Sequence, residues 1–347
     1  MKPKALLIRA DAGLSVGTGH VMRMFALAEA WLELGGEVTF LGHVPDALTA
    51  RGKALGVDMR QMSAGADAAQ TRACAEQVGA HWVAADGYAF TEVWQRDARS
   101  NSVRLMIVDD NAENRPYAAD CVLNVNVHAT EAMYVARSPV TRLLLGPTYA
   151  LIRSEFRRAL AVRQVPAFAS RWLVTMGGSD PVDATGQFLA AIADSNLAGV
   201  SIEVLVGPAN PRGEAYASLA SRSPVPVALS SAVSDVTVPM ARADLALSAS
   251  GGTVWELALM GVPAAVVSLA PNQAQLAASL AALGVAVPLG EAKAGGDGHG
   301  WLSAMKSLAS NAQSRTQMLS RACTLVDGQG PFRVARALRE ESFDARV

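Results

Sequence analysis

Short apolar runs alternate with helix-length segments along almost the whole chain of 347 residues, and this alternation constrains the fold more than any other feature. In the segment 21–34, for example, Val21, Met24, Phe25 and Ala28 form one apolar stripe at helical spacing. Strands that alternate with helices in this way form parallel sheets with helices on both faces. The sequence therefore predicts an α/β protein. We expect strands at 5–9, 37–41, 82–85, 104–108, 121–125 and 143–145, and then at 172–176, 202–206, 225–229, 245–248 and 264–269.

The opening pattern occurs twice, about half the chain apart. An apolar run at 6–8 leads into a glycine-rich turn and a helix, and a second run at 173–175 does the same. This repetition predicts two Rossmann-like domains, and the length fits two domains of about 150 residues each. We expect an N-terminal domain over 1–160, a C-terminal domain over 161–330, and a helix in 331–347 that packs back on the N-terminal domain.

Composition argues against several classes of protein. The 30 basic and 31 acidic side chains leave a net charge of −1, which removes the global electrostatic case for binding nucleic acid or an anionic membrane, although a local basic patch remains compatible with it. The three cysteines lie far apart, which predicts neither a disulfide framework nor a zinc site and favours the cytoplasm. The charge-free stretch between Glu256 and Glu291 is interrupted by Pro263 and Pro271 before about 20 apolar residues accumulate, so we expect a buried strand and helix rather than a stable membrane insertion.

The turn after the first strand carries a histidine at the start of a helix. Small residues in the segment 11–23 would let a ligand approach the backbone and the free N–H groups of the helix. Binding of NAD is disfavoured, because Met22 replaces the third glycine of the dinucleotide fingerprint and Glu37 begins the second strand instead of ending it. His20 stands where strand order usually leaves a crevice, although a capping or core histidine fits the spacing equally well.

Three motifs stand out in the second half. Gly177 and Gly178 open a tight loop that suits either a ligand or an ordinary strand-to-helix turn. The run Gly251-Gly252-Thr253 at a predicted helix start suits a diphosphate, and Glu256 one turn later could accept hydrogen bonds from a ribose diol. The amides of Asn272 and Gln273 end an apolar strand and could bind sugar hydroxyl or acyl groups, or simply cap a helix.

Aspartates end two further strands, at the edge where α/β proteins bind ligands. They are Asp86, followed by Gly87 and Tyr88, and the pair at 109–110. Neither is a DxD metal motif, and the sequence has no P-loop or nucleophile elbow. The other histidines lack paired spacing and are expected to be structural or solvent-facing: His43, His81, His128 and His299.

Together these segments resemble the GT-B superfamily, in which two Rossmann-like domains with parallel sheets face each other across a cleft. Within it the chain is similar to the UDP-2,4-diacetamido-2,4,6-trideoxy-β-L-altropyranose hydrolases of pseudaminic acid biosynthesis (the PseG family). The resemblance covers nearly the whole chain, in order. It is carried by the segments 9–11, 17–23, 86–88, 108–110, 144–156, 177–181, 251–256 and 272–273. At 124–126 the family usually has Asp-Gln-Asn, so only Asn126 carries over.

The resemblance implies hydrolysis of the bond between the anomeric carbon and UDP, with inversion and without metal or cofactor. His20 would be the catalytic base that deprotonates a water molecule, a task that suits histidine because the ordinary pKa of an imidazole, ~6.5, is near neutral. Substrate-binding residues would be Asp11, Gly17, Gly19, Arg23, Tyr88, Asn126, Asn272 and Gln273. UDP-binding residues would be Gly177, Gly178, Gly251, Gly252, Thr253 and Glu256. The partner would be the UDP-linked diacetamido trideoxy sugar, the protein a cytoplasmic monomer, and the final product a component of flagellin or another surface glycan.

Two other functions fit the same sequence. A glycosyltransferase of the same fold, similar to the peptidoglycan transferase MurG, would pass the sugar to an acceptor instead of water. A non-catalytic subunit that binds nucleotide sugars would need the binding residues without the base. His20 within its motif favours an enzyme.

Overall fold

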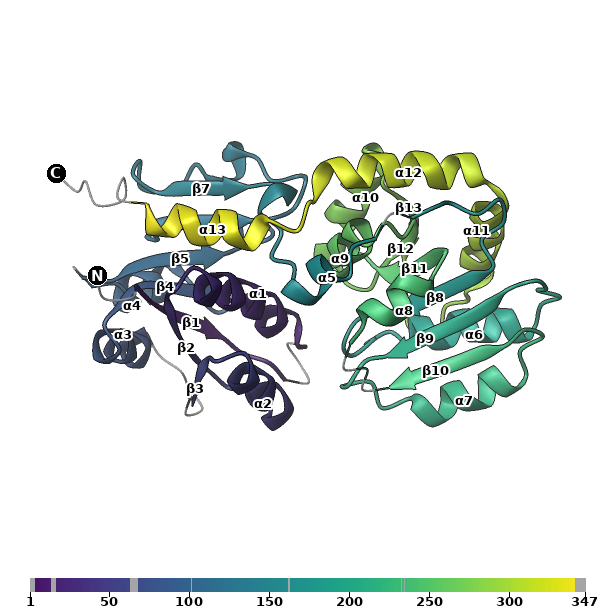
Figure 1. Ribbon diagram of the computed structural model, residues 1–347, viewed down its shortest axis with the longest axis horizontal. Coiled ribbons are helices and arrows are strands. Elements are labelled where there is room, and N and C mark those ends of the chain that lie inside the picture. Colours follow the sequence, from purple (N-terminus) through teal and green to yellow (C-terminus); the bar gives the residue numbers. More distant parts are fainter. Residues whose placement is uncertain are drawn as a thin grey trace. The chain divides into compact units, whose positions relative to one another are not determined.

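The computed structural model describes residues 4–13, 17–62, 68–100, 102–161, 163–231, 233 and 235–340. The chain forms two compact units, one made of residues 1–154 and 328–347 and the other of residues 155–327 (Figure 1). The boundary lies at 154/155, a few residues before the expected 160/161, and the first unit contains both ends of the chain.

The first unit is built on a parallel sheet in which seven strands are described, in the order β3-β2-β1-β4-β5-β6-β7. Its strands are β1 (Ala5–Ala10), β2 (Glu37–Gly42), β3 (Asp58–Gln61), β4 (Ala80–Asp86), β5 (Arg104–Val108), β6 (Cys121–Asn124) and β7 (Arg142–Leu145). Its helices are α1 (Gly19–Glu33), α2 (Asp46–Ala54), α3 (Ala68–Gln77), α4 (Glu92–Ala98) and α13 (Gly330–Arg339), with 3₁₀ turns at Glu131–Tyr134 and Pro147–Tyr149.

The second unit repeats this plan with strands in the order β10-β9-β8-β11-β12-β13. They are β8 (Arg171–Thr175), β9 (Ser201–Val206), β10 (Val227–Ser231), β11 (Leu245–Ala249), β12 (Ala264–Ser268) and β13 (Ala286–Glu291). The helices are α6 (Ala184–Ala193), α7 (Gly213–Ser221), α8 (Thr237–Arg242), α9 (Thr253–Leu259), α10 (Ala274–Ala282), α11 (His299–Ser310) and α12 (Ala312–Leu325), with a 3₁₀ turn at Pro271–Gln273. The short helix α5 (Ser154–Arg158) connects the units in sequence.

The predicted class, an α/β protein with two parallel-sheet domains, is confirmed. Every expected strand is present, with ends shifted by a few residues at most. The sequence missed β3 and β13, which are edge strands of their sheets. Their residues are mostly polar or partly exposed, because an edge strand has only one hydrogen-bonded neighbour and is less enclosed by helices.

The C-terminal helix α13 packs against α1 in the first unit (Figure 1). The guanidinium of Arg339 lies 5.3 Å from the ring centroid of Trp31, and its Nη1 donates to the carbonyl of Leu34. Lys4 Nζ donates to the carbonyl of Arg339 at 2.8 Å. Residues 341–347, the end of the helix segment expected at 331–347, lie outside the described residues. Across the described part of the chain, no helix combines the length and apolar character that a membrane span requires.

Each sheet contains one point at which strand order reverses. In the first sheet this point lies between β1 and β4, and in the second between β8 and β11. Successive connections leave such a point in opposite directions, so the loops at the carboxyl ends of the two strands spread apart and leave a crevice. The fold therefore places the loops after β1, β4, β8 and β11 where ligands of α/β proteins usually bind.

Backbone contact holds the loop after β8 in its place. A Cβ atom added to Gly207, which follows β9, would lie 2.2 Å from the carbonyl oxygen of Gly177 and 2.4 Å from that of Gly178. The nitrogen of Ala209 donates to the same Gly178 carbonyl at 2.9 Å. The loops after β8 and β9 therefore fit together only because residue 207 has no side chain.

We predict that Gly207→Ala lowers the free energy of unfolding by about 1–3 kcal/mol, because the new methyl group would overlap backbone that cannot rotate away. Gly213→Ala is the matched control, since a Cβ there meets nothing within 4 Å and alanine favours the helix that begins at that residue. Urea unfolding followed by circular dichroism measures both. Equal stability of the two variants would contradict the proposed backbone contact.

Candidate functional site

His20 and Asp86 meet at the reversal point of the first sheet. His20 lies in the first turn of α1, just after β1, and Asp86 is the last residue of β4. Strands β1 and β4 pair in parallel, with Ala10 opposite Asp86. This pairing brings together two residues that are 66 positions apart in the sequence.

The imidazole of His20 is held by the Asp86 carboxylate. His20 Nδ1 lies 2.7 Å from Asp86 Oδ1, and both residues are buried. An ionised carboxylate only accepts hydrogen bonds, so the proton of this bond belongs to Nδ1. In the neutral ring the lone pair is then on Nε2, which is the atom that can accept a proton. This is the geometry of a histidine base with an orienting carboxylate.

Arg23 keeps Asp86 ionised. Its Nε lies 2.5 Å from Asp86 Oδ2 and its Nη2 lies 2.7 Å from Asp86 Oδ1, which makes a bidentate pair. Burial alone would raise the pKa of Asp86, but the charges and hydrogen bonds of Arg23 and His20 outweigh it and hold the pKa well below its usual range. Arg23 Nη1 donates to Asp110 Oδ2 at 2.6 Å. Arg23 was predicted to bind substrate, and in the structure three of its nitrogens bind these two carboxylates.

Tyr88 and Asn126 complete this cluster. The Tyr88 ring meets the His20 ring edge to face, with centroids 5.0 Å apart and an interplanar angle of 83°, and Tyr88 is 57% exposed. Its pKa is raised by burial and by the nearby Asp110 charge, so the phenol is neutral. Asn126 Nδ2 donates to Asp110 Oδ1 at 3.2 Å. The structure thus gathers His20, Arg23, Tyr88 and Asn126 around two aspartates that end β4 and follow β5.

The remaining predicted residues of this unit shape the backbone nearby. Asp11 accepts two hydrogen bonds from Arg9, at 2.6 and 2.8 Å, and one from the nitrogen of His43. Burial would raise the pKa of Asp11, but these partners lower it overall. Gly17 has a φ of +75°, and a Cβ added there or at Gly19 would meet nothing within 4 Å. Residues 14–16 of this motif lie outside the described residues.

In the second unit, the predicted UDP-binding residues follow β8 and β11, and the predicted substrate-binding residues Asn272 and Gln273 follow the neighbouring strand β12. Gly177 has a φ of +77°, and the loop it begins ends at the buried Asp180, whose carboxylate accepts from the nitrogens of Ala184 and Thr185. These contacts are what an ordinary strand-to-helix turn requires. The structure therefore gives Gly177 and Gly178 a structural role whether or not they also touch a ligand.

The loops after β11 and β12 lie side by side. Ser250 Oγ lies 3.0 Å from Ser268 Oγ in the buried end of the sheet. Gln273 Oε1 accepts from the nitrogen of Leu269 at 2.9 Å, and its Nε2 lies 3.8 Å from where a Cβ of Gly251 would be. A Cβ at Gly252 would meet nothing within 4 Å. The geometry thus places Gln273 next to Gly251. Thr253 and Glu256 lie in the first turn of α9, and Asn272 stands just before Gln273.

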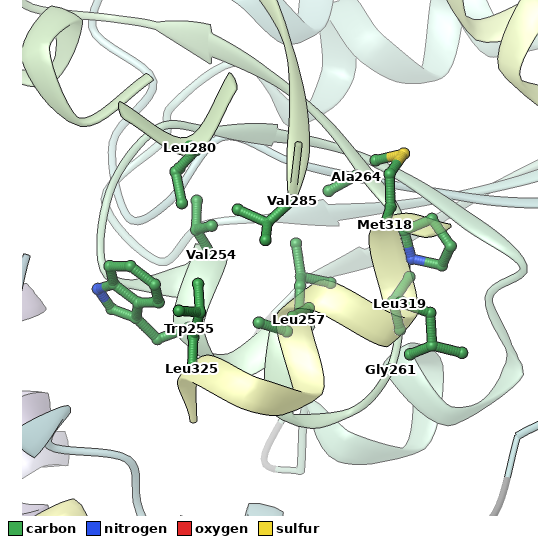
Figure 2. Close-up of a pocket in the computed structure, with 14 residues that line it drawn as sticks. Val254, Trp255, Leu257, Gly261, Ala264, Leu280, Val285, Met318, Leu319 and Leu325 are labelled. Atoms are coloured by element: carbon green, nitrogen blue, oxygen red, sulfur yellow. The ribbon is translucent and has the colours of Figure 1, made fainter. Parts of the chain in front are cut away.

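The buried face of α9 packs on α10 and α12 around a small apolar cavity lined by Trp255, Leu257 and Met318 among others (Figure 2). Its volume of about 10 Å³ is about that of one water molecule. The cavity is a packing gap beside α9 and is far too small for a sugar nucleotide.

The sequence shows Asp86 and Asp110 only as aspartates at strand ends and does not indicate their partners. The available signal was their place at the ligand-binding edge of the sheet. Within the described ranges, no group of three or more His, Cys, Asp or Glu side chains is arranged to hold a metal ion.

No protein-family model matches the chain. The spore coat polysaccharide biosynthesis protein SpsG of Bacillus subtilis (strain 168) is 29% identical over 206 residues, which cover 58% of this chain. The match spans 59% of the length of SpsG.

Solved structures match over almost the whole chain. MurG of Acinetobacter baumannii has 18% identity and a TM-score of 0.63, covering 97% of this chain and 99% of that one. MnaA of S. aureus, solved with UDP, has 13% identity and a TM-score of 0.69, covering 99% of this chain and 98% of that one. Identities this low establish the fold alone. The two parallel-sheet units and these matches over nearly the full length show that the chain has the GT-B fold.

Proposed function

We propose that the chain is a nucleotide-sugar hydrolase that cleaves UDP from UDP-2,4-diacetamido-2,4,6-trideoxy-β-L-altrose, with inversion at the anomeric carbon. The resemblance of its motifs to the PseG family, the GT-B fold and the solved UDP complex of a structural neighbour support this proposal. The observation that carries it is the buried contact between His20 Nδ1 and Asp86 Oδ1, because it makes Nε2 a base.

In the proposed reaction, His20 Nε2 accepts a proton from a water molecule on the face of the sugar opposite the diphosphate. The water oxygen forms a bond to the anomeric carbon while the bond from that carbon to the UDP oxygen breaks, and UDP leaves with the electron pair. Asp86 stabilises the imidazolium that forms, and Arg23 keeps Asp86 ionised throughout. Tyr88 and Asn126, with Asp11, Gly17 and Gly19, would shape the sugar pocket.

The second unit would hold the nucleotide. The backbone N–H groups at Gly251 and Gly252 and the hydroxyl of Thr253 suit a diphosphate, with Gly177 and Gly178 on the neighbouring loop. Glu256 would accept hydrogen bonds from the ribose, and the amides of Asn272 and Gln273 would contact the sugar. The proposal requires the two units to face each other, so that UDP held by the second presents its sugar to His20 of the first.

A glycosyltransferase is the second candidate, favoured by the match to MurG over the full chain. The same histidine would then deprotonate an acceptor hydroxyl instead of water. The partial match to a protein of spore coat polysaccharide biosynthesis fits either reaction, since both supply sugars for surface glycans such as glycosylated flagellin.

Incubation with the UDP-sugar in the absence of any acceptor distinguishes these functions. We expect stoichiometric release of UDP and free sugar, and the first-formed anomer seen by ¹H NMR should be inverted. Turnover that depends on an added acceptor would establish a transferase. Tight binding without turnover under either condition would establish a non-catalytic binding protein.

We predict that His20→Ala lowers kcat by roughly 10²–10⁴-fold with little change in UDP affinity, because the lost imidazole acts on water and not on the nucleotide. Steady-state kinetics and calorimetric titration with UDP measure the two quantities. His81→Ala, at an exposed position of β4, is the matched control and should behave as wild type. Near wild-type turnover of His20→Ala would remove this residue from the mechanism.

Asp86→Asn tests the orienting role separately. Asparagine can accept from or donate to Nδ1, so it no longer fixes the tautomer, and we expect a loss of kcat of at least tenfold with UDP affinity retained. Asp97→Asn, an exposed position in α4, is the control. If Asp86→Asn keeps full kcat, or loses UDP affinity in proportion to kcat, the carboxylate is only structural.

Glu256→Ala should weaken UDP binding by about tenfold, because a carboxylate that accepts from the ribose diol contributes about 1.5 kcal/mol. Glu214→Ala, which also removes a glutamate from a first helical turn, is the matched control. In wild type, 2′,3′-dideoxy-UDP should bind as weakly as UDP binds to Glu256→Ala, and the variant should not distinguish the two ligands. A variant that still prefers UDP would show that the diol is recognised elsewhere.

A further inference from the structure

Asp86 and Asp110 share the guanidinium of Arg23 but differ in their exposure to solvent. Val108, the last residue of β5, pairs with Asp86, and Asp110 follows two residues later at the same edge of the sheet. The side chain of Asp86 is 0% exposed, whereas that of Asp110 is 29% exposed. A ligand at this edge can therefore reach the carboxylate of Asp110 but not that of Asp86.

The carboxylate of Asp110 can accept further hydrogen bonds. From the described residues, its Oδ2 accepts from Arg23 Nη1 at 2.6 Å and its Oδ1 from Asn126 Nδ2 at 3.2 Å. A carboxylate has about four lone-pair positions, so about two remain for a ligand. The neighbouring Asp109 is different, because it is buried and its two oxygens already accept four hydrogen bonds from described residues.

The backbone of Asp110 is held by side chains that follow β6 or end it. Asn124 Nδ2 donates to the carbonyl of Asp110 at 2.9 Å and lies 2.7 Å from the hydroxyl of Tyr134. His128 Nε2 lies 3.2 Å from the same carbonyl, which can only accept, so the ring donates this bond. These contacts fix the position of Asp110, and a ligand that binds to a fixed acceptor loses less free energy in ordering it.

The accessible carboxylate belongs to the same cluster as the candidate base. Arg23 connects Asp110 to Asp86, which binds His20 Nδ1. Burial and then the charge of Asp110 raise the pKa of Tyr88, whose ring centroid lies 5.0 Å from that of His20. A sugar whose anomeric carbon receives a water molecule from His20 would therefore bring its own substituents close to Asp110.

We propose that Asp110 is a specificity-determining residue, which accepts a hydrogen bond from an O–H or N–H group of the sugar. This inference rests on the proposed function, because that function supplies the ligand. A carboxylate has no proton to donate, so this position favours a donor and disfavours a carbonyl, ether or carboxylate oxygen of the ligand. The proposed substrate offers donors in its hydroxyl group at C3 and in the N–H groups of its acetamido substituents.

Calorimetric titration with UDP and with the C-glycosidic analogue of the UDP-sugar tests the proposal. A methylene group replaces the glycosidic oxygen in this analogue, so neither hydrolysis nor transfer consumes it. We expect wild type to bind the analogue more tightly than UDP. Asp110→Asn should reduce this gain about tenfold, because a hydrogen bond to a charged group is lost, while the affinity for UDP itself stays the same.

Glu113→Gln is the matched control. Glu113 lies on the loop after β5, its side chain is exposed, and its charge also raises the pKa of Tyr88. The variant removes a nearby negative charge without changing the carboxylate of Asp110, so it should keep the full gain. Thermal unfolding followed by circular dichroism establishes that both variants are folded.

The 3-deoxy form of the same analogue identifies the donor. If Asp110→Asn no longer weakens binding of this form, the donor is the hydroxyl at C3, and if it weakens binding as before, the donor is an acetamido N–H. A gain that Asp110→Asn leaves intact would overturn the inference and reduce Asp110 to a partner of Arg23, and so would the absence of any gain in wild type. Failure of wild type to hydrolyse the UDP-sugar would contradict the proposed function alone, since the binding measurement needs no turnover.

Discussion

The buried carboxylate of Asp86 is the group on which the candidate site depends. It is removed from solvent, yet it is ionised because Arg23 grips both of its oxygens and His20 donates to one of them. A charge buried in this way is tolerated only when such partners are complete. Asp86 is therefore fixed by Arg23 and His20, and each of those two side chains is held by Asp86. The hydrogen bond to Asp86 gives the imidazole one orientation and one tautomer, which is the preorganisation that the proposed role as a base would require.

This arrangement follows from the topology of the sheet. The pairing of β1 with β4 sets the end of one strand beside the start of α1, and the next strands, β5 and β6, bring Asp110 and Asn126 to the same edge. The second unit uses its own reversal point in the same manner, with glycine loops where the first has charged side chains. The same topology thus places charged side chains at the carboxyl ends of the strands in the first unit and glycine-containing loops at the corresponding ends in the second.

The sequence was sufficient for what depends on local pattern. Apolar runs located the central strands, and the glycine-rich turn before α1 made His20 a candidate site residue. It could not reveal contacts that only tertiary pairing creates. Asp86 lies 66 residues from His20, and no spacing rule relates them. The motif around Arg23 predicts that it binds substrate, and the fold adds two partners that the motif does not reveal, Asp86 and Asp110. The edge strand β3 escaped notice because its residues are mostly polar, and β13 because Pro288 and Gly290 interrupt its apolar run.

The first unit takes its last helix from the far end of the chain, whereas the second is one continuous segment. A ribosome therefore synthesises every residue of the second unit before it adds α13. Before α13 is made, Trp31 on α1 lacks its contact with the guanidinium of Arg339. The middle of the polypeptide can acquire its native structure during synthesis, while the histidine-bearing part reaches its complete form only after α13 has been made.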